Sequence, residues 1–329
     1  MAVEAGVPQL GGPSLKAALD RDWDDPVERD QALGVVLGCL EQVEGFVADR
    51  RLAVPQVDAA LGAARQVQDQ DVQAADGQPP TLRQGVARDR RISIEDPQMR
   101  HGRKSRSHLV DGYKRHVLRD LDSGLVCAVG VTAANLPEAA GAIQIRDDLA
   151  AQQATLAELH IDRAYLSSVL VRDRPEELAI FCKAWRVRNG PRFAKTDFTL
   201  DFDHGLLVCP AGQQLPFTPG GKVQFPAEIC AACPLRTQCT TSPRGRSVQI
   251  HPDERLLAEL RQRQLTPHGR ARLRERVAVE HSLAHLGHWQ GRRARYLGQR
   301  KNLFDLRRVA VVHNLHVIAR APWADQQAA

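Results

Sequence analysis

The sequence lacks the features that mark secreted and membrane proteins. Its first residues, MAVEAGVPQLGGPSLK, do not follow the basic-then-apolar order of a signal peptide. No uninterrupted apolar run approaches the length that spans a bilayer. We find no internal repeat. We therefore expect a cytoplasmic protein with no membrane partner.

A large charge excess is also missing. Lys and Arg number 45 against 39 Asp and Glu, a net charge of +6 over 329 residues. With 43% hydrophobic residues and 26% charged ones, the chain is typical of globular proteins of one large or two ordinary domains. The basic residues are clustered at 87–91, 100–106 and 290–308. Such clusters are expected where a protein face meets a polyanion, although solvated helix surface is the alternative for each.

Cysteines are few, and most gather in one stretch. Seven cysteines without a secretory segment argue against a disulfide framework. Three are scattered among apolar neighbours and are expected as small buried hydrophobes: Cys39, Cys127 and Cys182. The other four lie in a Gly- and Pro-rich stretch and include one C-x2-C pair: Cys209, Cys230, Cys233 and Cys239. These four suit a structural tetrahedral zinc site, and reduced thiols in a loop are the alternative.

The amino-terminal quarter predicts helices. Residues 1–75 form a helical segment, with helices over 26–50 and 55–70 that each begin with a proline suited to a first turn. A linker is expected over 76–90.

From residue 91 the pattern changes to strands and helices. Strands are predicted at 91–96, 112–121, 124–133, 157–162 and 177–185, the second and third joined as a hairpin by DSG. Helices are predicted at 137–153, from about 166, at 251–264, at about 267–289 and at 301–320. This order implies an α/β fold with a mixed sheet covered by helices, interrupted by the cysteine-bearing residues 187–250.

Asp162 ends the alternating strand LAELHID. Sites assemble at the carboxyl ends of strands in such sheets, which makes Asp162 a candidate metal ligand. The alternatives are a cap on the following helix or a pair with Arg163.

Glu280 interrupts an apolar pattern on the helix predicted at about 267–289. Helical spacing places it on one face with Leu273, Val277, Leu283 and Ala284. A carboxylate that loses water there needs a cation, and Mg²⁺ shared with Asp162 would supply it. An ion pair with Arg276, four residues earlier, is the alternative.

Three stretches carry a resemblance to a known family. HIDRAYLSS, RERVAVEHSLAHLGHWQGRRARYLGQRKNLFDLRR and the four-cysteine segment together resemble the DDE transposases of bacterial insertion sequences, in the branch with a cysteine-bearing insert before the catalytic Glu. The resemblance covers about residues 91–318.

The resemblance implies a ribonuclease-H-like fold whose carboxylates bind two Mg²⁺ and cut and join transposon DNA. Asp162 matches the family's second catalytic Asp and Glu280 its Glu, and Arg276 matches an arginine that contacts DNA near the active site. Leu273 stands where the family often has Tyr, and Gly287 where it often has Lys.

The family's first catalytic Asp has no clear match in residues 1–95, so the chain resembles a transposase shortened at its amino terminus. Asp96 is the local candidate for that role, with a turn-starting Asp-Pro as the favoured alternative. Asp111 and Asp120 are weaker candidates.

Basic residues beyond the Glu helix are the predicted DNA contacts. Interleaved with Tyr296 and Phe304, they are Arg292, Arg293, Arg295, Arg300, Lys301, Arg307 and Arg308. His281, His285 and His288 are interpreted as polar-face or DNA-facing side chains, ahead of metal ligands.

The sequence thus predicts a ribonuclease-H-like transposase domain at 91–318 with a tail at 319–329. The predicted function is Mg²⁺-dependent DNA transposition. The alternatives are an inactive, zinc-stabilised DNA-binding remnant and a nuclease that completes its site with Asp96. The expected partners are transposon-end and target DNA, and a homodimer is a further hypothesis.

Overall fold

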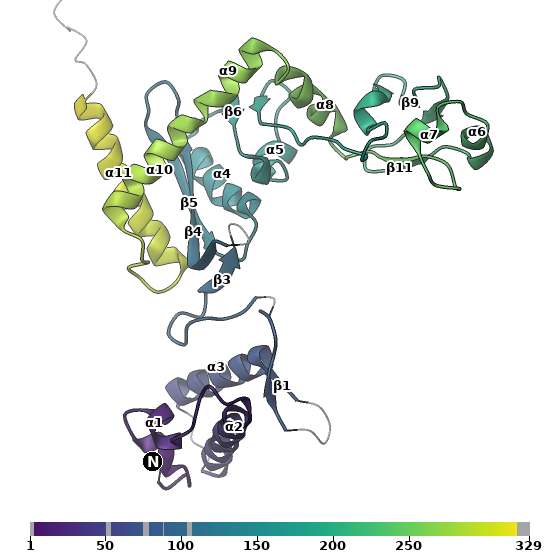
Figure 1. Ribbon diagram of the computed structural model, residues 1–329. Coiled ribbons are helices and arrows are strands. Elements are labelled where there is room, and N and C mark those ends of the chain that lie inside the picture. The colour runs from purple at the N-terminus through teal and green to yellow at the C-terminus, as the bar shows by residue number, and fades with distance from the viewer. Residues whose placement is uncertain (1–2, 51–53, 75–78, 88, 104–106, 321–329) are drawn as a thin grey trace, which may run out of the picture. The chain divides into compact units, whose positions relative to one another are not determined.

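The computed structural model describes residues 3–50, 54–74, 79–87, 89–103 and 107–320 (Figure 1). The chain divides into two compact units. The first comprises residues 1–115, 131–136 and 291–306, and the second comprises 116–130, 137–290 and 307–329. The predicted tail at 319–329 lies almost wholly outside the described residues.

The amino-terminal part of the first unit is helical, as the sequence predicts. The helices are α1 (Leu15–Leu19), α2 (Pro26–Asp49) and α3 (Pro55–Asp71), after a short 3₁₀ turn, η1 (Pro8–Gly11). The Asp25 carboxylate accepts a hydrogen bond from the amide of Val27 and caps α2. An ion pair between Glu44 and Arg65 joins α2 to α3.

The helix α2 is the one described helix that is long and apolar enough to cross a membrane by length and composition. It lies near the amino terminus and contains Glu41 and Glu44. The second of these carboxylates pairs with Arg65 of α3.

The predicted linker at 76–90 is partly structured. Val72–Gln73 (β1) pairs antiparallel with Thr81–Leu82 (β2), so the segment begins as a small hairpin. Residues 76–78 and 88 lie outside the described residues.

The prediction of a strand at 91–96 is wrong. Only an isolated bridge between Arg91 and Arg100 forms there. The Arg91 guanidinium donates to the carbonyls of Ser93 and Ile94, and Ser93 Oγ accepts from the amide of Asp96. These local hydrogen bonds replace the strand ladder that the alternating pattern favoured.

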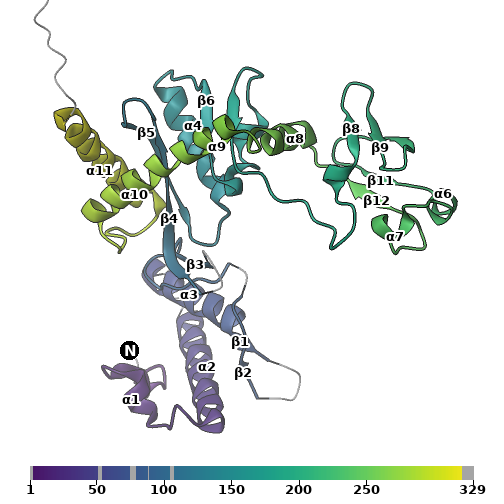
Figure 2. The same cartoon turned by 45° about the horizontal axis from the view of Figure 1, so that its top comes forward.

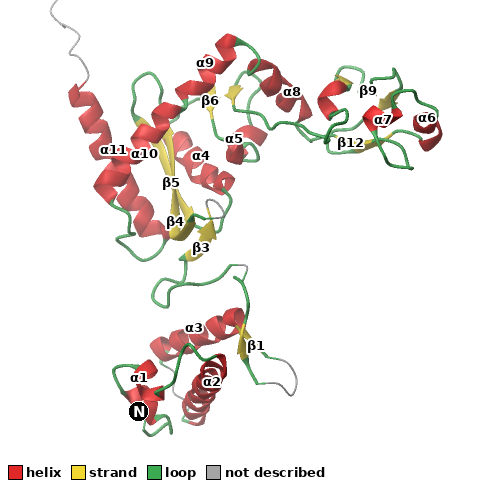
Figure 3. Cartoon of the chain, in the orientation of Figure 1, coloured by secondary structure: helices red, strands yellow, loops and turns green. Residues whose placement is uncertain are grey.

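The strands form several small sheets, as Figures 2 and 3 show, and the predicted mixed sheet is divided among them. A three-stranded sheet has the order β3 (Arg100–Arg103), β4 (Leu109–Arg119), β5 (Val126–Ala133). The hairpin between β4 and β5 is confirmed and closes with a hydrogen bond from the Asp120 amide to the Leu125 carbonyl. A second sheet pairs β6 (Glu158–His160) with β7 (Ala179–Phe181) in parallel. The fold class is α/β, consistent with a ribonuclease-H-like domain.

The main core of the second unit lies around β6 and β7. Leu159 and Ile180 from these strands pack with Val171 of the short helix α5 (Val169–Arg172) and with Leu260 of α8 (Glu254–Arg263). The helix α4 (Ala142–Ala151), preceded by η2 (Glu138–Gly141), packs Ile145 and Leu149 against Ala128 of β5. The core therefore holds β6 in place, and Asp162 follows this strand.

The cysteine-bearing residues 187–250 have a small hydrophobic core of their own. Its elements are η4 (Lys195–Asp197), β8 (Thr199–Asp201), β9 (Leu206–Val208), β10 (Gln214–Pro216), β11 (Lys222–Gln224), α6 (Ala227–Ala231), α7 (Arg236–Cys239) and β12 (Ser247–Gln249). Phe198, Leu207, Phe225 and Ile250 are buried together. Glu254 of α8 pairs with Lys195 of η4 and links this segment to the helix that follows.

The helix predicted at 267–289 is two helices. The first, α9, covers Pro267–Glu275, and the second, α10, covers Val277–Gln290. Arg276 lies at the junction, where α9 ends. The last helix, α11 (Gln299–Arg320), confirms the prediction for 301–320.

Candidate active site

Asp162 lies two residues after the end of β6 and caps the 3₁₀ turn η3 (Arg163–Tyr165). Its Oδ1 accepts a hydrogen bond from the amide of Ala164 at 3.3 Å. The alternative left open by the sequence was a cap on a helix beginning near Leu166; the structure shows the cap on this turn instead, and the helix α5 begins later, at Val169. The side chain is 55% exposed, so the cap leaves carboxylate oxygen available to a ligand.

Glu280 is exposed, in contrast to the expectation that it loses water in an apolar stripe. Its side chain is 61% exposed. The face of α10 that is buried carries Ser282, Leu286 and Gln290 at four-residue spacing. Glu280 lies two residues before Ser282, about 200° around the helix and so nearly opposite that face. The apolar residues counted with Glu280 lie mostly on α10 itself, and Val277 among them is 47% exposed, so the face that they share is not the buried one.

Arg276 brings the two carboxylates together. Its Nη1 lies 3.7 Å from Oδ2 of Asp162, and its Nη2 lies 3.4 Å from Oε1 of Glu280. The ion pair with Glu280 is the alternative named from the sequence, and the pair with Asp162 was not expected. The positive charge of one guanidinium thus compensates the negative charges of two carboxylates, Asp162 and Glu280, that are 118 residues apart in the chain.

Two further arginines hold α9 and α10 against the strands. Arg272 of α9 pairs with Glu158 of β6. Arg119 of β4 donates to the Ala278 carbonyl at 2.8 Å and to Ser282 Oγ at 3.0 Å. Contacts from two strands therefore fix where the helix presents Glu280 relative to Asp162.

A buried histidine lies behind the Asp162 turn. His116 of β4 is 1% exposed, and its Nδ1 lies 2.6 Å from the Tyr165 hydroxyl. Burial raises the pKa of Tyr165, with Glu138 and Asp162 acting in the same direction. A Cβ at Gly141 would lie 2.3 Å from the His116 ring, so only glycine fits there. Sequence reasoning missed His116, because its neighbours Arg115 and Val117 give no alternation in the predicted strand at 112–121 that would mark it as buried.

Cys182, just after β7, is buried close to the same carboxylate. Burial raises the pKa of this thiol to about 12, and Asp162 adds to the effect while Arg163 and Arg276 oppose it. The thiol is therefore an inert, protonated neighbour of the site at neutral pH. Cys39 and Cys182 are buried, as predicted, and Cys127 is half-buried.

Asp96 is occupied by hydrogen bonds within the first unit. The residue is 3% exposed, and its Oδ2 accepts from the Tyr113 hydroxyl at 2.6 Å and from the Gly298 amide at 2.9 Å. Oδ1 accepts from the Gln98 amide. Burial alone would raise the pKa of Asp96, but these hydrogen bonds outweigh burial and lower it. This arrangement favours the turn alternative and anchors the start of α11.

Replacing Asp96 with Ala is expected to lower the free energy of unfolding by about 1 to 3 kcal/mol, because buried donors lose a charged acceptor. Mg²⁺ affinity, measured by calorimetry on folded protein, is expected to stay unchanged. The control is Asp111→Ala, which removes an exposed carboxylate paired with His101. A loss of Mg²⁺ affinity in the Asp96 variant alone would instead identify Asp96 as a ligand.

The carboxylates Asp162 and Glu280 offer hard oxygen donors, the type that Mg²⁺ prefers. Within the residues that the structure describes, no group of three or more His, Cys, Asp or Glu side chains is placed to hold a metal ion. Asp120 is engaged in the β4–β5 turn, where it accepts hydrogen bonds from Ser123 that lower its pKa. The site therefore presents two carboxylates and one arginine.

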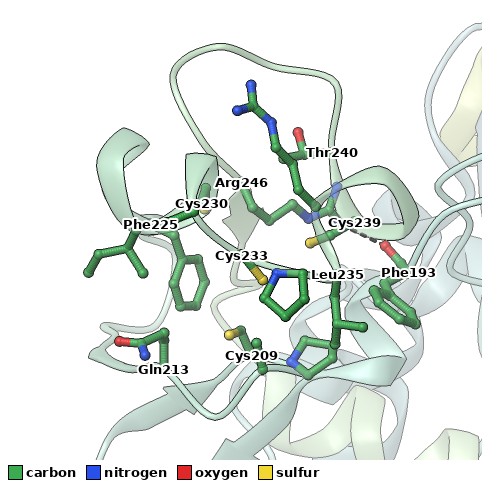
Figure 4. A pocket seen from close by; sticks show the side chains of 16 residues that line it. Phe193, Cys209, Gln213, Phe225, Cys230, Cys233, Leu235, Cys239, Thr240 and Arg246 are labelled. Carbon is green, nitrogen blue, oxygen red and sulfur yellow. Dashed lines mark hydrogen bonds between the residues drawn. The ribbon is translucent and has the colours of Figure 1, made fainter.

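The four gathered cysteines line one cavity of about 320 Å³. Figure 4 shows the thiols of Cys209, Cys233 and Cys239 directed toward a common space, with Arg246 above it. Burial raises the pKa of Cys239, while the Arg246 guanidinium acts in the opposite direction. All four thiols are free. The sequence grouped them correctly, although they are not arranged as a metal centre.

The predicted DNA-contacting arginines and lysine are all on the surface. In the first unit, the exposed residues are Arg292, Arg293, Arg295, Arg300 and Lys301. In the second unit, Arg307 and Arg308 are exposed, and Arg307 pairs with Asp148. The segment before α11 is anchored by Asn302, whose amide donates to the carbonyls of Tyr296 and Gly298.

The histidines of α10 differ in their surroundings. His281 and His288 are exposed. His285 packs between the last two helices, where its Nδ1 lies 2.7 Å from Nδ1 of His313. Burial lowers the pKa of both rings of this pair.

Comparison with known proteins gives matches to family models. Two of these, each described as a transposase DDE domain, match residues 68–192 and 208–319. The first range contains Asp162, and the second contains Arg276, Glu280 and all seven of the predicted DNA-contacting side chains at 292–308. No curated protein and no solved structure matches the chain. Over these two ranges, the chain resembles transposase DDE domains.

Proposed function

We propose that the chain catalyses Mg²⁺-dependent cutting and joining of transposon-end DNA at Asp162 and Glu280. The observation that carries the proposal is the position of Arg276, whose guanidinium lies within 4 Å of both carboxylates. Matches to transposase DDE domains on both sides of residues 193–207 support the same function. DNA is the partner that such domains act on.

Each of the three residues has a role that follows from its chemistry. Bound Mg²⁺ would activate the attacking oxygen and stabilise the leaving oxygen of a phosphodiester. Asp162 and Glu280 would hold the ion through carboxylate oxygens. Arg276 would turn from these carboxylates to a phosphate oxygen of the DNA, because a guanidinium pairs with phosphate as well as with carboxylate.

The experiment uses purified chain and labelled duplexes that carry the ends of its element. Mg²⁺-dependent cleavage at the end, absent in EDTA, supports the proposal. Salt-sensitive DNA binding without cleavage in Mg²⁺ or Mn²⁺ supports the alternative, a DNA-binding protein without catalysis. The observation that favours this alternative is that the described residues place two carboxylates together and no third.

The exposed basic side chains of 292–308 support a role in holding DNA phosphates, and this role stays a prediction for each of them. A cytoplasmic location fits transposases in general. The homodimer and the identity of the first catalytic Asp also stay predictions.

We further propose that the four-cysteine cavity binds a structural zinc ion. Support comes from four free thiols on the wall of one cavity, since sulfur ligands suit Zn²⁺. Because the four thiols do not form a metal-holding group in the described residues, binding would have to bring them closer together. Four thiolates would leave no coordination position for substrate, so the ion would stabilise residues 187–250.

The purified protein is expected to contain one zinc ion per chain after desalting, measured by mass spectrometry, and Cys233→Ser is expected to lose it. At free zinc about 1,000-fold above its Kd, the ion stabilises the fold by about 4 kcal/mol, so chelation should lower the melting temperature. The control is Cys39→Ser, which changes a buried cysteine outside the cavity. A metal-free protein whose melting temperature is unaffected by zinc or chelator would contradict the proposal.

A further inference from the structure

An exposed tryptophan follows the strand beside Asp162. After β7 the chain continues with alternating burial. Cys182 is 1% exposed and Ala184 is 3% exposed, whereas Lys183 and Trp185 face solvent. Trp185 is 48% exposed, although an indole gains more from burial than most side chains. An aromatic ring held outward by its buried neighbours is available to a flat ligand.

This tryptophan lies close to the candidate active site. The β7 strand is the parallel neighbour of β6, and Asp162 follows β6 at its carboxyl end. The Arg163 guanidinium, next to Asp162 in the chain, lies 6.0 Å from the centre of the Trp185 ring. The charges of Asp162 and Arg276 both act on the pKa of Cys182, which lies three residues before Trp185. The ring therefore stands beside the residues proposed to contact a phosphodiester.

The segment that carries Trp185 is rich in exposed cations. Lys183, Arg186 and Arg188 are all exposed along the same extended segment. Arg163 completes the set from the neighbouring turn. A flat aromatic surface on a cationic segment is complementary to a nucleic acid strand, in which an aromatic base alternates with an anionic phosphate. An apolar protein partner would not need three exposed cations on the segment that carries the ring and a fourth 6.0 Å from its centre.

We propose that Trp185 stacks on an unpaired base of the DNA strand whose phosphodiester lies at Asp162 and Glu280. The inference rests on the proposed function, which supplies the DNA. Lys183 and Arg186 would contact the phosphates on either side of that base. Because every base has a flat face, this contact selects for unpaired DNA over duplex and does not read sequence. Trp185 is thus a binding residue for the open strand at the cut site.

The test is binding without cleavage, measured in EDTA by fluorescence anisotropy. The probes are a blunt duplex and the same duplex with a single-stranded extension at the cut site. Trp185→Ala is expected to weaken binding to the extended probe by roughly 5-fold to 150-fold, with little change for the blunt duplex. Trp185→Phe keeps an aromatic face and should retain most of the affinity.

The matched control is Trp289→Ala, which removes an indole of similar exposure, 41%, from α10. It should bind both probes like the parent protein. The stacking inference would be overturned if Trp185→Ala bound the extended probe as tightly as the parent protein does. It would also be overturned if Trp185→Ala lost the same factor of affinity for both probes. Cleavage measured separately in Mg²⁺ tests the proposed function, so an inactive protein that still prefers the extended probe through Trp185 would overturn only that function.

Discussion

Replacing Glu280 with Gln is expected to reduce Mg²⁺-dependent cleavage of transposon-end DNA by more than about 100-fold. Partners that merely orient metal ligands already contribute 10-fold to 100-fold, and a ligand itself contributes at least as much. The change keeps the shape of the side chain and removes its negative charge. Because Glu280 is 61% exposed and lies off the buried face of α10, the fold should be unaffected. We therefore expect the cleavage rate of Glu280→Gln to fall while its melting temperature stays the same as that of the parent protein.

The matched control is Glu259→Gln, which also removes an exposed glutamate from an i, i+4 pair with arginine, here Arg263 on α8. It should cleave DNA like the parent protein. Asp162→Asn should reduce the cleavage rate as much as Glu280→Gln does. The double variant should cleave no more slowly than either single variant, since the effects of residues that act as a unit are not additive. Calorimetric Mg²⁺ titration should show weaker binding in both single variants. Undiminished cleavage by Glu280→Gln would exclude this residue from the catalytic site.

The two carboxylates selected from the sequence, Asp162 and Glu280, both lie beside Arg276 in the structure, but one of the physical reasons for selecting them was incorrect. Asp162 could be placed at a strand end because the alternation of LAELHID is local to the chain. Glu280 was selected as a charge within an apolar stripe, and the structure shows it exposed. Helical counting grouped Val277 and Glu280 correctly on one face of α10, but the fold leaves that face exposed and buries the face of Leu286 instead. The family-like order of the motifs identified Glu280 independently of that count.

Contacts between distant segments could not be predicted from the sequence. The pairing of Arg276 with Asp162 and of Arg272 with Glu158 depends on how α9 lies against β6. The strand at 91–96 was predicted from alternation alone, and hydrogen bonds from Arg91 and Ser93 decided otherwise. Periodicity reports which face of an element is apolar, whereas such side-chain contacts depend on the tertiary arrangement.

Replacing Lys195 with Met is expected to lower the free energy of unfolding by about 3 to 5 kcal/mol, because it leaves a buried carboxylate with one of its two cations. That carboxylate belongs to Glu254, which is 2% exposed and pairs with Lys195 and Arg261. The pair links the cysteine-bearing residues to α8, so urea unfolding followed by circular dichroism should show a lower midpoint. Arg255→Met, which breaks an exposed pair with Asp203, is the control and should change stability by less than about 1 kcal/mol.

The ion pair of Glu254 with Lys195 also leads us to expect that the stability of the protein depends on pH. Burial alone would raise the pKa of Glu254, but the hydrogen bonds it accepts outweigh burial and hold its pKa below 4.5. A carboxyl with a depressed pKa contributes stability above its unfolded value and loses it as pH falls through the folded value. The parent protein should therefore keep this contribution at pH 5 and lose it progressively below about pH 4.5. Without Lys195 the folded pKa rises, so Lys195→Met should show little of this acid-dependent loss. Equal acid sensitivity in the parent and in Lys195→Met would show that Glu254 does not govern stability in this range.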